Sequence, residues 1–170
     1  MRPTSTRRKT AVLAGVAVVG LSTAVFLAQS DAAMGTARSS ETTFTVVEQP
    51  GTFHFVDLPP MQKHPNTASA GDELAFINTL TQGGKRVGRA QAVCTFTKAG
   101  HARNPLLQCE GSFTLQGSEL TVAGAIAFNS STMHIAITGG TGKYEGAGGQ
   151  IIAVNHPDGS STDTVHVILP

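Results

Sequence analysis

The chain has 170 residues, of which 40% are hydrophobic, 5% are aromatic and 14% are charged, and its formal net charge is +1. Several basic residues lie before position 10, and without the first 33 residues the chain has 8 Lys and Arg against 10 Asp and Glu, a net charge of −2. This balance excludes the basic surface that nucleic-acid-binding proteins use. The length suits one domain with a single core.

The first part of the chain has the pattern of a secretory signal peptide. Basic residues precede an apolar run, Ala11–Ala28, and small residues follow it. We expect cleavage near residues 30–33, so that 1–33 is the signal peptide, 34–41 a flexible linker and 42–170 a single domain. The protein would then be secreted. An uncleaved membrane anchor, which would keep it at the cell envelope, is the alternative.

The rest of the chain has the residue pattern of β-strands, with hardly any helical periodicity. Alternating or apolar runs bounded by turn residues indicate strands. We expect them at residues 42–48, 53–58, 73–80, 119–128, 149–154 and 162–169, in the run from Thr132, and in two runs that carry Cys94 and Cys109. The count predicts an all-β domain, a closed antiparallel β-barrel of about eight strands, with an open sandwich as the alternative.

The two cysteines flank a polar loop, residues 99–104. A hairpin centred on this loop places Cys94 opposite Cys109, where a disulfide can close a loop of about 15 residues, worth about 3 kcal/mol in the chain-entropy model. Because the leader predicts export to an oxidising environment, we expect the disulfide. Two buried free thiols are the alternative.

A glycine-rich corner follows the strand that starts at Thr132. Gly139, Gly140 and Gly142 can supply the positive φ angles of a tight corner. The corner is no phosphate-binding loop, because Lys143 precedes Tyr144 rather than Ser or Thr. None of the six histidines has a partner at metal-ligand spacing. We therefore expect neither a metal nor a cofactor.

Four segments in order resemble the allene oxide cyclase and dirigent barrel superfamily. They are FHFVDL from Phe53, GDELAFINTL from Gly71, VGRAQAVC from Val87 and the strand–GGTG–strand block from Thr132 to Val154. The resemblance implies an eight-stranded barrel with a lumen into which Cys94 points. It also implies a homo-oligomer, either a trimer or a dimer.

The resemblance also implies candidate site residues. Asn78 and Cys94 match pocket residues of the allene oxide cyclases, whereas their glutamate aligns with His54 and their pocket tyrosine falls near Ile126. Asp57 matches the first acid of the dirigent proteins. We therefore name Asp57 and Asn78 as catalytic candidates. The candidate ligand-binding residues are His54, Asn78, Cys94, Phe96, Phe113 and Ile126.

Two of these assignments compete with structural roles. Asp57 and His54 lie on opposite faces of one strand by simple alternation, so both line the lumen only if a bulge intervenes. Asp57 could instead cap a strand end, and Asn78 could hold the turn at residues 81–84.

Three classes of function remain open. The barrel could bind a hydrophobic small molecule in its lumen without a reaction. It could be a cofactor-independent isomerase or cyclase, or a dirigent-type protein, that steers ring closure or coupling by fixing the conformation of its substrate. It could also be a non-catalytic surface or scaffold protein. Nucleic acid is not an expected partner.

Overall fold

A computed structural model describes residues 39–59, 68–99 and 104–170 of the chain. The expected signal peptide and most of the expected linker lie outside the described residues. The elements are β1 (Ser40–Val56), β2 (Glu73–Gln82), β3 (Lys85–Lys98), β4 (Leu106–Leu115), β5 (Ser118–Ala127), β6 (Thr132–Thr141), the 3₁₀ turn η1 (Gly142–Tyr144), β7 (Gly148–Asn155) and β8 (Ser161–Leu169).

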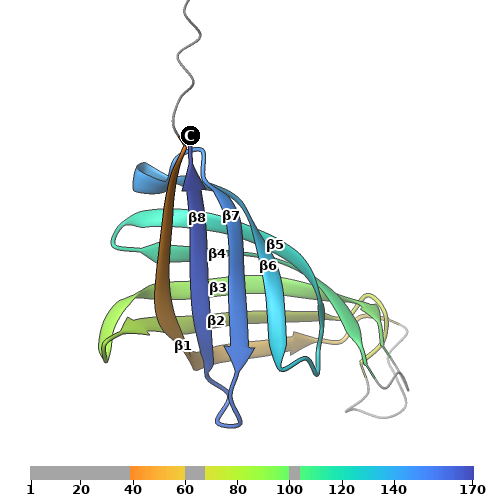
Figure 1. Ribbon diagram of the computed structural model, residues 1–170. Coiled ribbons are helices and arrows are strands. Elements are labelled where there is room, and N and C mark those ends of the chain that lie inside the picture. Colours follow the sequence, from red (N-terminus) through yellow and green to blue (C-terminus); the bar gives the residue numbers. More distant parts are fainter. Residues whose placement is uncertain (1–38, 60–67, 100–103) are drawn as a thin grey trace, which may run out of the picture. The chain divides into compact units, whose positions relative to one another are not determined.

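The eight strands form a closed antiparallel barrel (Figure 1). Each strand pairs with the next one in the chain, and β8 pairs with β1 to close the sheet. The predicted fold class is confirmed, and the open sandwich is excluded. Closure leaves no free sheet edge, and it gives the barrel an interior that side chains must fill or line.

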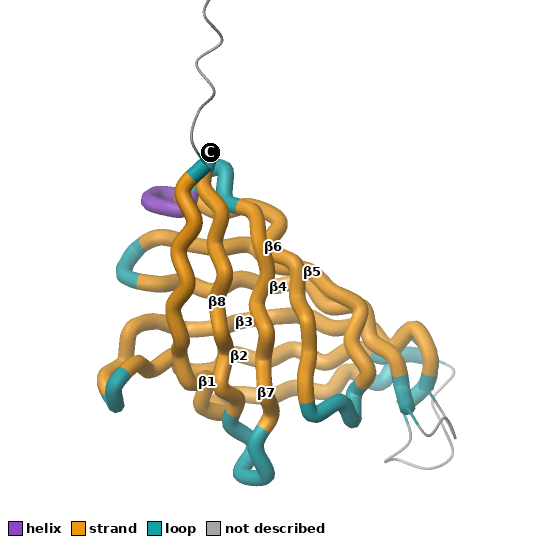
Figure 2. Tube along the Cα trace, in the orientation of Figure 1, coloured by secondary structure: helices purple, strands orange, loops and turns teal. Residues whose placement is uncertain are grey.

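The first strand is longer than the sequence predicts. Residues 42–48 and 53–58 were expected as separate strands, but β1 runs through both. Its first part pairs with β8 and its second part pairs with β2. Figures 1 and 2 show the resulting bend, at which β1 stops running beside β8 and continues beside β2.

A β-bulge at Pro50 and Gly51 produces this bend. The pairing of β1 with β2 shifts between Gln49 and Thr52. A side chain on Gly51 would collide with the backbone carbonyl of Ile77, so the strands approach closely there because residue 51 is glycine. The prediction of two strands was wrong because the Pro-Gly pair bends the strand instead of ending it.

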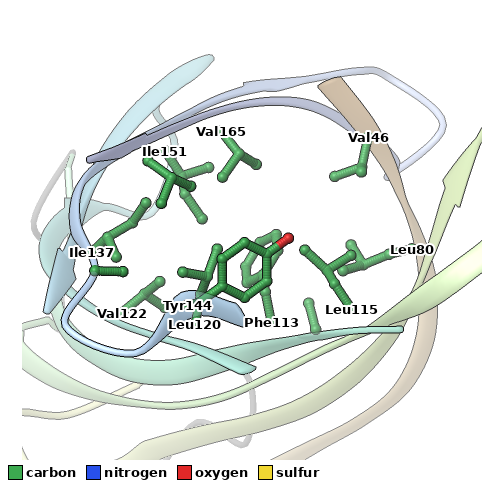
Figure 3. Packing of buried hydrophobic residues seen from close by; sticks show 13 residues of the cluster. Val46, Leu80, Phe113, Leu115, Leu120, Val122, Ile137, Tyr144, Ile151 and Val165 are labelled. Carbon is green, nitrogen blue, oxygen red and sulfur yellow. The ribbon is translucent and has the colours of Figure 1, made fainter. Parts of the chain in front are cut away.

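A hydrophobic core fills the end of the barrel near the C-terminus (Figure 3). All eight strands contribute to it, together with η1 and the residues after it. Its buried members are Val46, Leu80, Ala90, Phe113, Leu115, Leu120, Val122, Ile137, Tyr144, Ala147, Ile151, Val165 and Val167.

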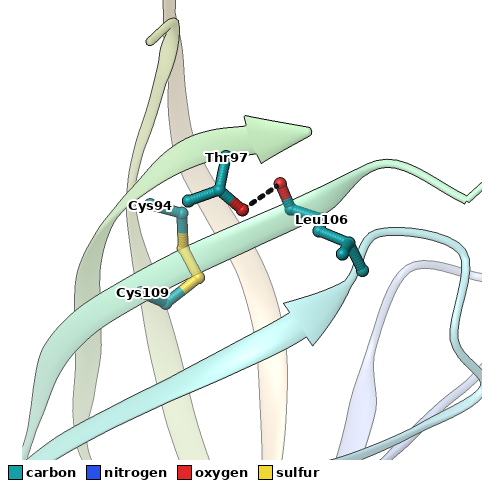
Figure 4. Close-up of a disulfide and its surroundings, with 4 residues drawn as sticks. All are labelled: Cys94, Thr97, Leu106 and Cys109. Atoms are coloured by element: carbon teal, nitrogen blue, oxygen red, sulfur yellow. Dashed lines mark hydrogen bonds between the residues drawn. A yellow bond between two sulfur atoms is a disulfide. The ribbon is translucent and has the colours of Figure 1, made fainter. Parts of the chain in front are cut away.

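The β3–β4 hairpin has the predicted register. Cys94 pairs with Cys109, and the two form a disulfide across the strands (Figure 4). Beside it, Thr97 Oγ1 donates a hydrogen bond of 3.2 Å to the carbonyl of Leu106. Both cysteines are buried. The covalent link therefore fixes the register of β3 against β4 on the inner face of the barrel.

The glycine corner agrees in part with its prediction. Gly142 has a φ of 62°, as expected, but Gly139 and Gly140 do not have positive φ angles. Gly140 is required for space instead, because a Cβ there would lie 2.6 Å from the carbonyl oxygens of both Glu119 and Tyr144. The corner thus depends on one backbone angle and on one close approach.

We predict that Gly140→Ala lowers the free energy of unfolding by about 1–3 kcal/mol, because the added methyl group forces backbone atoms apart. Gly148→Ala is the matched control, since a Cβ at Gly148 has no atom within 4 Å, and it should change stability by less than about 0.5 kcal/mol. Chemical denaturation of both variants measures the difference. Equal midpoints would contradict the close approach at Gly140.

Candidate active site in the barrel lumen

A cavity of about 340 Å³ opens inside the barrel next to the core. Ala90, Phe113 and Val122 belong both to the core and to the cavity wall, so the core forms its floor. Further apolar wall residues are Phe53, Leu74, Phe76, Leu107, Ile126, Phe128, Met133 and Ile135. This volume lies within the range of small-molecule sites in proteins.

A polar cluster occupies one side of the cavity. Its members come from four adjacent strands, β7, β8, β1 and β2, and they are Glu48, Asn78, Asn155, Ser161 and Asp163. The register pairs Glu48 with Ser161 and Val46 with Asp163, so Glu48 and Asp163 are diagonal neighbours on the inner face. Closure of the barrel between β1 and β8 therefore brings two acids together that lie far apart in the sequence.

Hydrogen bonds hold this cluster in place. Asn78 Nδ2 donates to Glu48 Oε1 at 2.6 Å, and Asn78 Oδ1 accepts from the Gly51 amide at 2.8 Å. Ser161 Oγ donates to Asp163 Oδ1 at 2.7 Å. The amide of Asn78 thus connects the β1 bulge to the carboxyl group of Glu48.

The two carboxyl groups are neighbours, and this disfavours a negative charge on both. Each acid affects the pKa of the other. Asp163 is fully buried, and within the described residues no amide or hydroxyl group donates to its Oδ2 atom. Because two carboxylates cannot donate to one another, a proton on one of them makes this contact favourable.

The environment favours the protonated form of Glu48. The pKa of Glu48 is raised from 4.5 to about 8, chiefly by burial and also by the charge of Asp163, while the hydrogen bond from Asn78 opposes the rise. Burial also raises the pKa of Asp163, but its hydrogen bonds to Ser161 and Glu48 lower it. Near neutral pH the raised pKa of Glu48 favours its protonated form, which makes Glu48 the candidate acid beside Asp163.

Most of the sequence-predicted site residues lie at this cavity. Asn78, Cys94, Phe113 and Ile126 are among the residues that line it. Phe96 is buried beside the disulfide and does not line the cavity, although its ring packs against that of Phe128 at 5.9 Å. Asn78 does not hold the turn at residues 81–84, because its side chain bonds to Gly51 and Glu48.

The two other predicted residues do not line the cavity. His54 is exposed and lies with Ile77 and Val93 along a hollow on the outer face of the sheet. Asp57 follows the end of β1, and its Oδ1 atom is buried without a hydrogen-bond partner among the described residues. The candidate acid is therefore Glu48 rather than Asp57 or a group at the position of His54.

Sequence reasoning missed Glu48 and Asp163, although the alternation of residues in their strands indicates that both face the interior. Glu48 continues the inward alternation that includes Val46, and Asp163 precedes Val165 and Val167 in the same alternation. A carboxylate that replaces an apolar residue in such a pattern faces the interior.

The described residues contain no group of three or more His, Cys, Asp or Glu side chains that could hold a metal ion. In the same part of the chain, no helix has the length and hydrophobicity needed to cross a membrane.

The raised pKa of Glu48 predicts a pH dependence of stability. The unfolded chain loses the Glu48 proton near pH 4.5 and the folded chain near pH 8. The contribution of Glu48 to the free energy of unfolding therefore falls as the pH rises between these two values and is constant below and above them. The slope is at most about 1.4 kcal/mol per pH unit, and partial exposure of Glu48 reduces it.

Glu48→Gln should therefore lose less stability than the wild type between pH 5 and pH 8, by about 1–3 kcal/mol. Denaturation at both pH values measures this, and Glu110→Gln on the exposed face of β4 is the control. Parallel pH profiles for the wild type and Glu48→Gln would contradict a buried, protonated Glu48.

The chain matches the protein family described as Dirigent-like protein over residues 26–169. A search of curated proteins found no match.

Several solved structures share the fold. A pyocyanin demethylase has 23% identity and a TM-score of 0.63, over 74% of this chain and 99% of that chain. The pterocarpan synthase dirigent protein PsPTS1 has 21% identity and a TM-score of 0.56, over 78% and 94%. The exo-specific intermolecular Diels-Alderase AbnU has 14% identity and a TM-score of 0.57, over 76% and 98%. At these identities the similarity concerns the fold.

Proposed function

The chain belongs to the Dirigent-like protein family, and from this premise we propose that its barrel binds a hydrophobic small molecule and closes a ring in it without a cofactor. The observation that carries the proposal is the pair of neighbouring acids, Glu48 and Asp163, on the polar side of a cavity whose other walls are largely apolar. Titratable groups with strongly shifted pKa values in a cavity are typical of acid–base sites. A filled barrel used as a scaffold would have neither the cavity nor the pair.

The pair can supply both proton transfers that a ring closure needs. Protonated Glu48 donates to a carbonyl oxygen of the ligand, which makes a conjugated carbon electrophilic. A hydroxyl oxygen of the same molecule forms a bond to that carbon and loses its proton to Glu48, which is a carboxylate after its donation. One carbon–oxygen bond forms and one proton moves between two oxygens, so the product is an isomer and no oxidant is required.

The apolar walls contribute by positioning the ligand. A flexible molecule held in one folded conformation reacts faster, because the entropy of bringing its two ends together is lost on binding. The similar structures include a Diels-Alderase, which belongs to a class of enzymes that form rings. This likeness supports ring closure as the type of reaction.

We also propose that the protein acts outside the cytoplasm. The disulfide between Cys94 and Cys109 supports this location, since such bonds persist in oxidising compartments. The leader pattern in the sequence agrees with it. Retention of the leader would place the protein at the cell envelope instead.

A para-quinone methide that carries a free hydroxyl group provides a test, because its absorbance disappears when the ring closes. We expect the wild type to accelerate the closure and Glu48→Gln to lose about 10²-fold or more of this acceleration. The affinity for the closed product should change little, since the apolar walls remain. Glu145→Gln, at an exposed position that does not line the cavity, should behave like the wild type.

Full activity of Glu48→Gln would contradict proton transfer by this residue. Tight binding of the closed product without any acceleration by the wild type would show a binding protein rather than an isomerase.

A further inference from the structure

We propose that the lumen selects its ligand by charge: it accepts planar aromatic molecules that are cationic or weakly basic, and it rejects anions such as carboxylates. The inference rests on the proposed function, because it concerns the ligand of the same cavity. It narrows the substrate class from hydrophobic molecules in general to one electrostatic type.

The first support is the absence of positive charge along the cavity. Among the described residues that line it, none is Lys, Arg or His, and the acids are Glu48, Asp163 and the exposed Glu110. Lys143 lies at a different hollow, near Tyr144. The ionisable side chains of the described cavity wall are therefore all acids, with no basic side chain among them to compensate a negative charge.

The second support is that the polar groups of the cavity are already engaged. Asn78 donates to Glu48 and accepts from the Gly51 amide. Asn155 Nδ2 donates to the carbonyl of Ser130 at 2.8 Å, and Ser161 donates to Asp163. An entering carboxylate would lose its water shell and meet few free donors, and burial of such an unpaired charge is strongly unfavourable.

Burial in the cavity is more favourable for a cation than for an anion. Asp163 is fully buried in the cavity wall, and its Oδ2 atom has no hydrogen-bond partner among the described residues. A cation in the cavity lies close to this acid, and the low dielectric constant of the interior strengthens the attraction between opposite charges. A weak base that enters uncharged can also take the proton of Glu48, which leaves an ion pair in the lumen.

The third support is the aromatic content of the cavity wall. Phe53, Phe76, Phe113 and Phe128 line the cavity. Phe53 is 59% exposed and Phe128 is 52% exposed, so both present apolar surface that a ligand can cover. Ring faces attract cations and stack on planar ligands. Negative charge at one side and aromatic rings elsewhere thus favour the same kind of molecule.

Three probes with one three-ring frame test the proposal: N-methylacridinium, which is cationic, acridine, which is neutral, and anthracene-9-carboxylate, which is anionic. Fluorescence titration at pH 7 gives the affinity of the wild type for each. We expect the cation to bind at least about 10-fold more tightly than the anion, because the two differ in charge and hardly in shape.

The variant Glu48→Gln/Asp163→Asn removes the charge of the pair and keeps its shape. It should lose about 10-fold or more in affinity for the cation, gain affinity for the anion and bind acridine within about 3-fold of the wild type. Glu145→Gln is the matched control, since it removes one exposed negative charge away from the cavity, and all three affinities should be unchanged.

Equal affinities of the wild type for the cation and the anion would overturn the charge selection, and this comparison needs no variant. Acridine distinguishes the two proposals. If acridine binds while the cation has no advantage, the charge selection fails and the aromatic-binding lumen stands; if none of the three binds, the proposed binding function fails as well.

Discussion

The side chain of Asn78 makes the two hydrogen bonds on which the barrel and its site both depend. Its carbonyl oxygen accepts from the Gly51 amide in the β1 bulge, and its amide nitrogen donates to Glu48. The bulge allows β1 to pair with β8 along its first part and with β2 along its second part. The residue that stabilises this bend therefore also fixes the position of the candidate acid.

The interior of the barrel has two parts with different purposes. One end is filled by close-packed apolar side chains, and the other contains a cavity that includes two acids. Burial of Glu48 and Asp163 is unfavourable for their charged forms, as the direction of both pKa shifts shows. Residues that oppose stability in this way are expected where a protein has a function that requires them.

Much of the fold could be predicted from residue patterns, because alternation in strands is a local property. The register of Cys94 against Cys109 followed from the centre of one hairpin, and the structure has that register. The bulge could not be predicted in this way. Pro50 and Gly51 resemble a turn in the sequence. His54 and Asp57 were named from the family resemblance, which pointed to residues after the bulge instead of Glu48 before it. The contact between Glu48 and Asp163 depends on closure of the barrel, which joins the first strand to the last and leaves no local signal.

The central claim is that Glu48 carries a proton near neutral pH beside the buried side chain of Asp163. Carbon-13 NMR of the side-chain carboxyl carbons over a pH titration measures this directly, with Glu48→Gln used to assign the resonance. The account predicts that the Glu48 carboxyl carbon titrates near pH 8. Titration of that carbon near its ordinary value of 4.5 would contradict it.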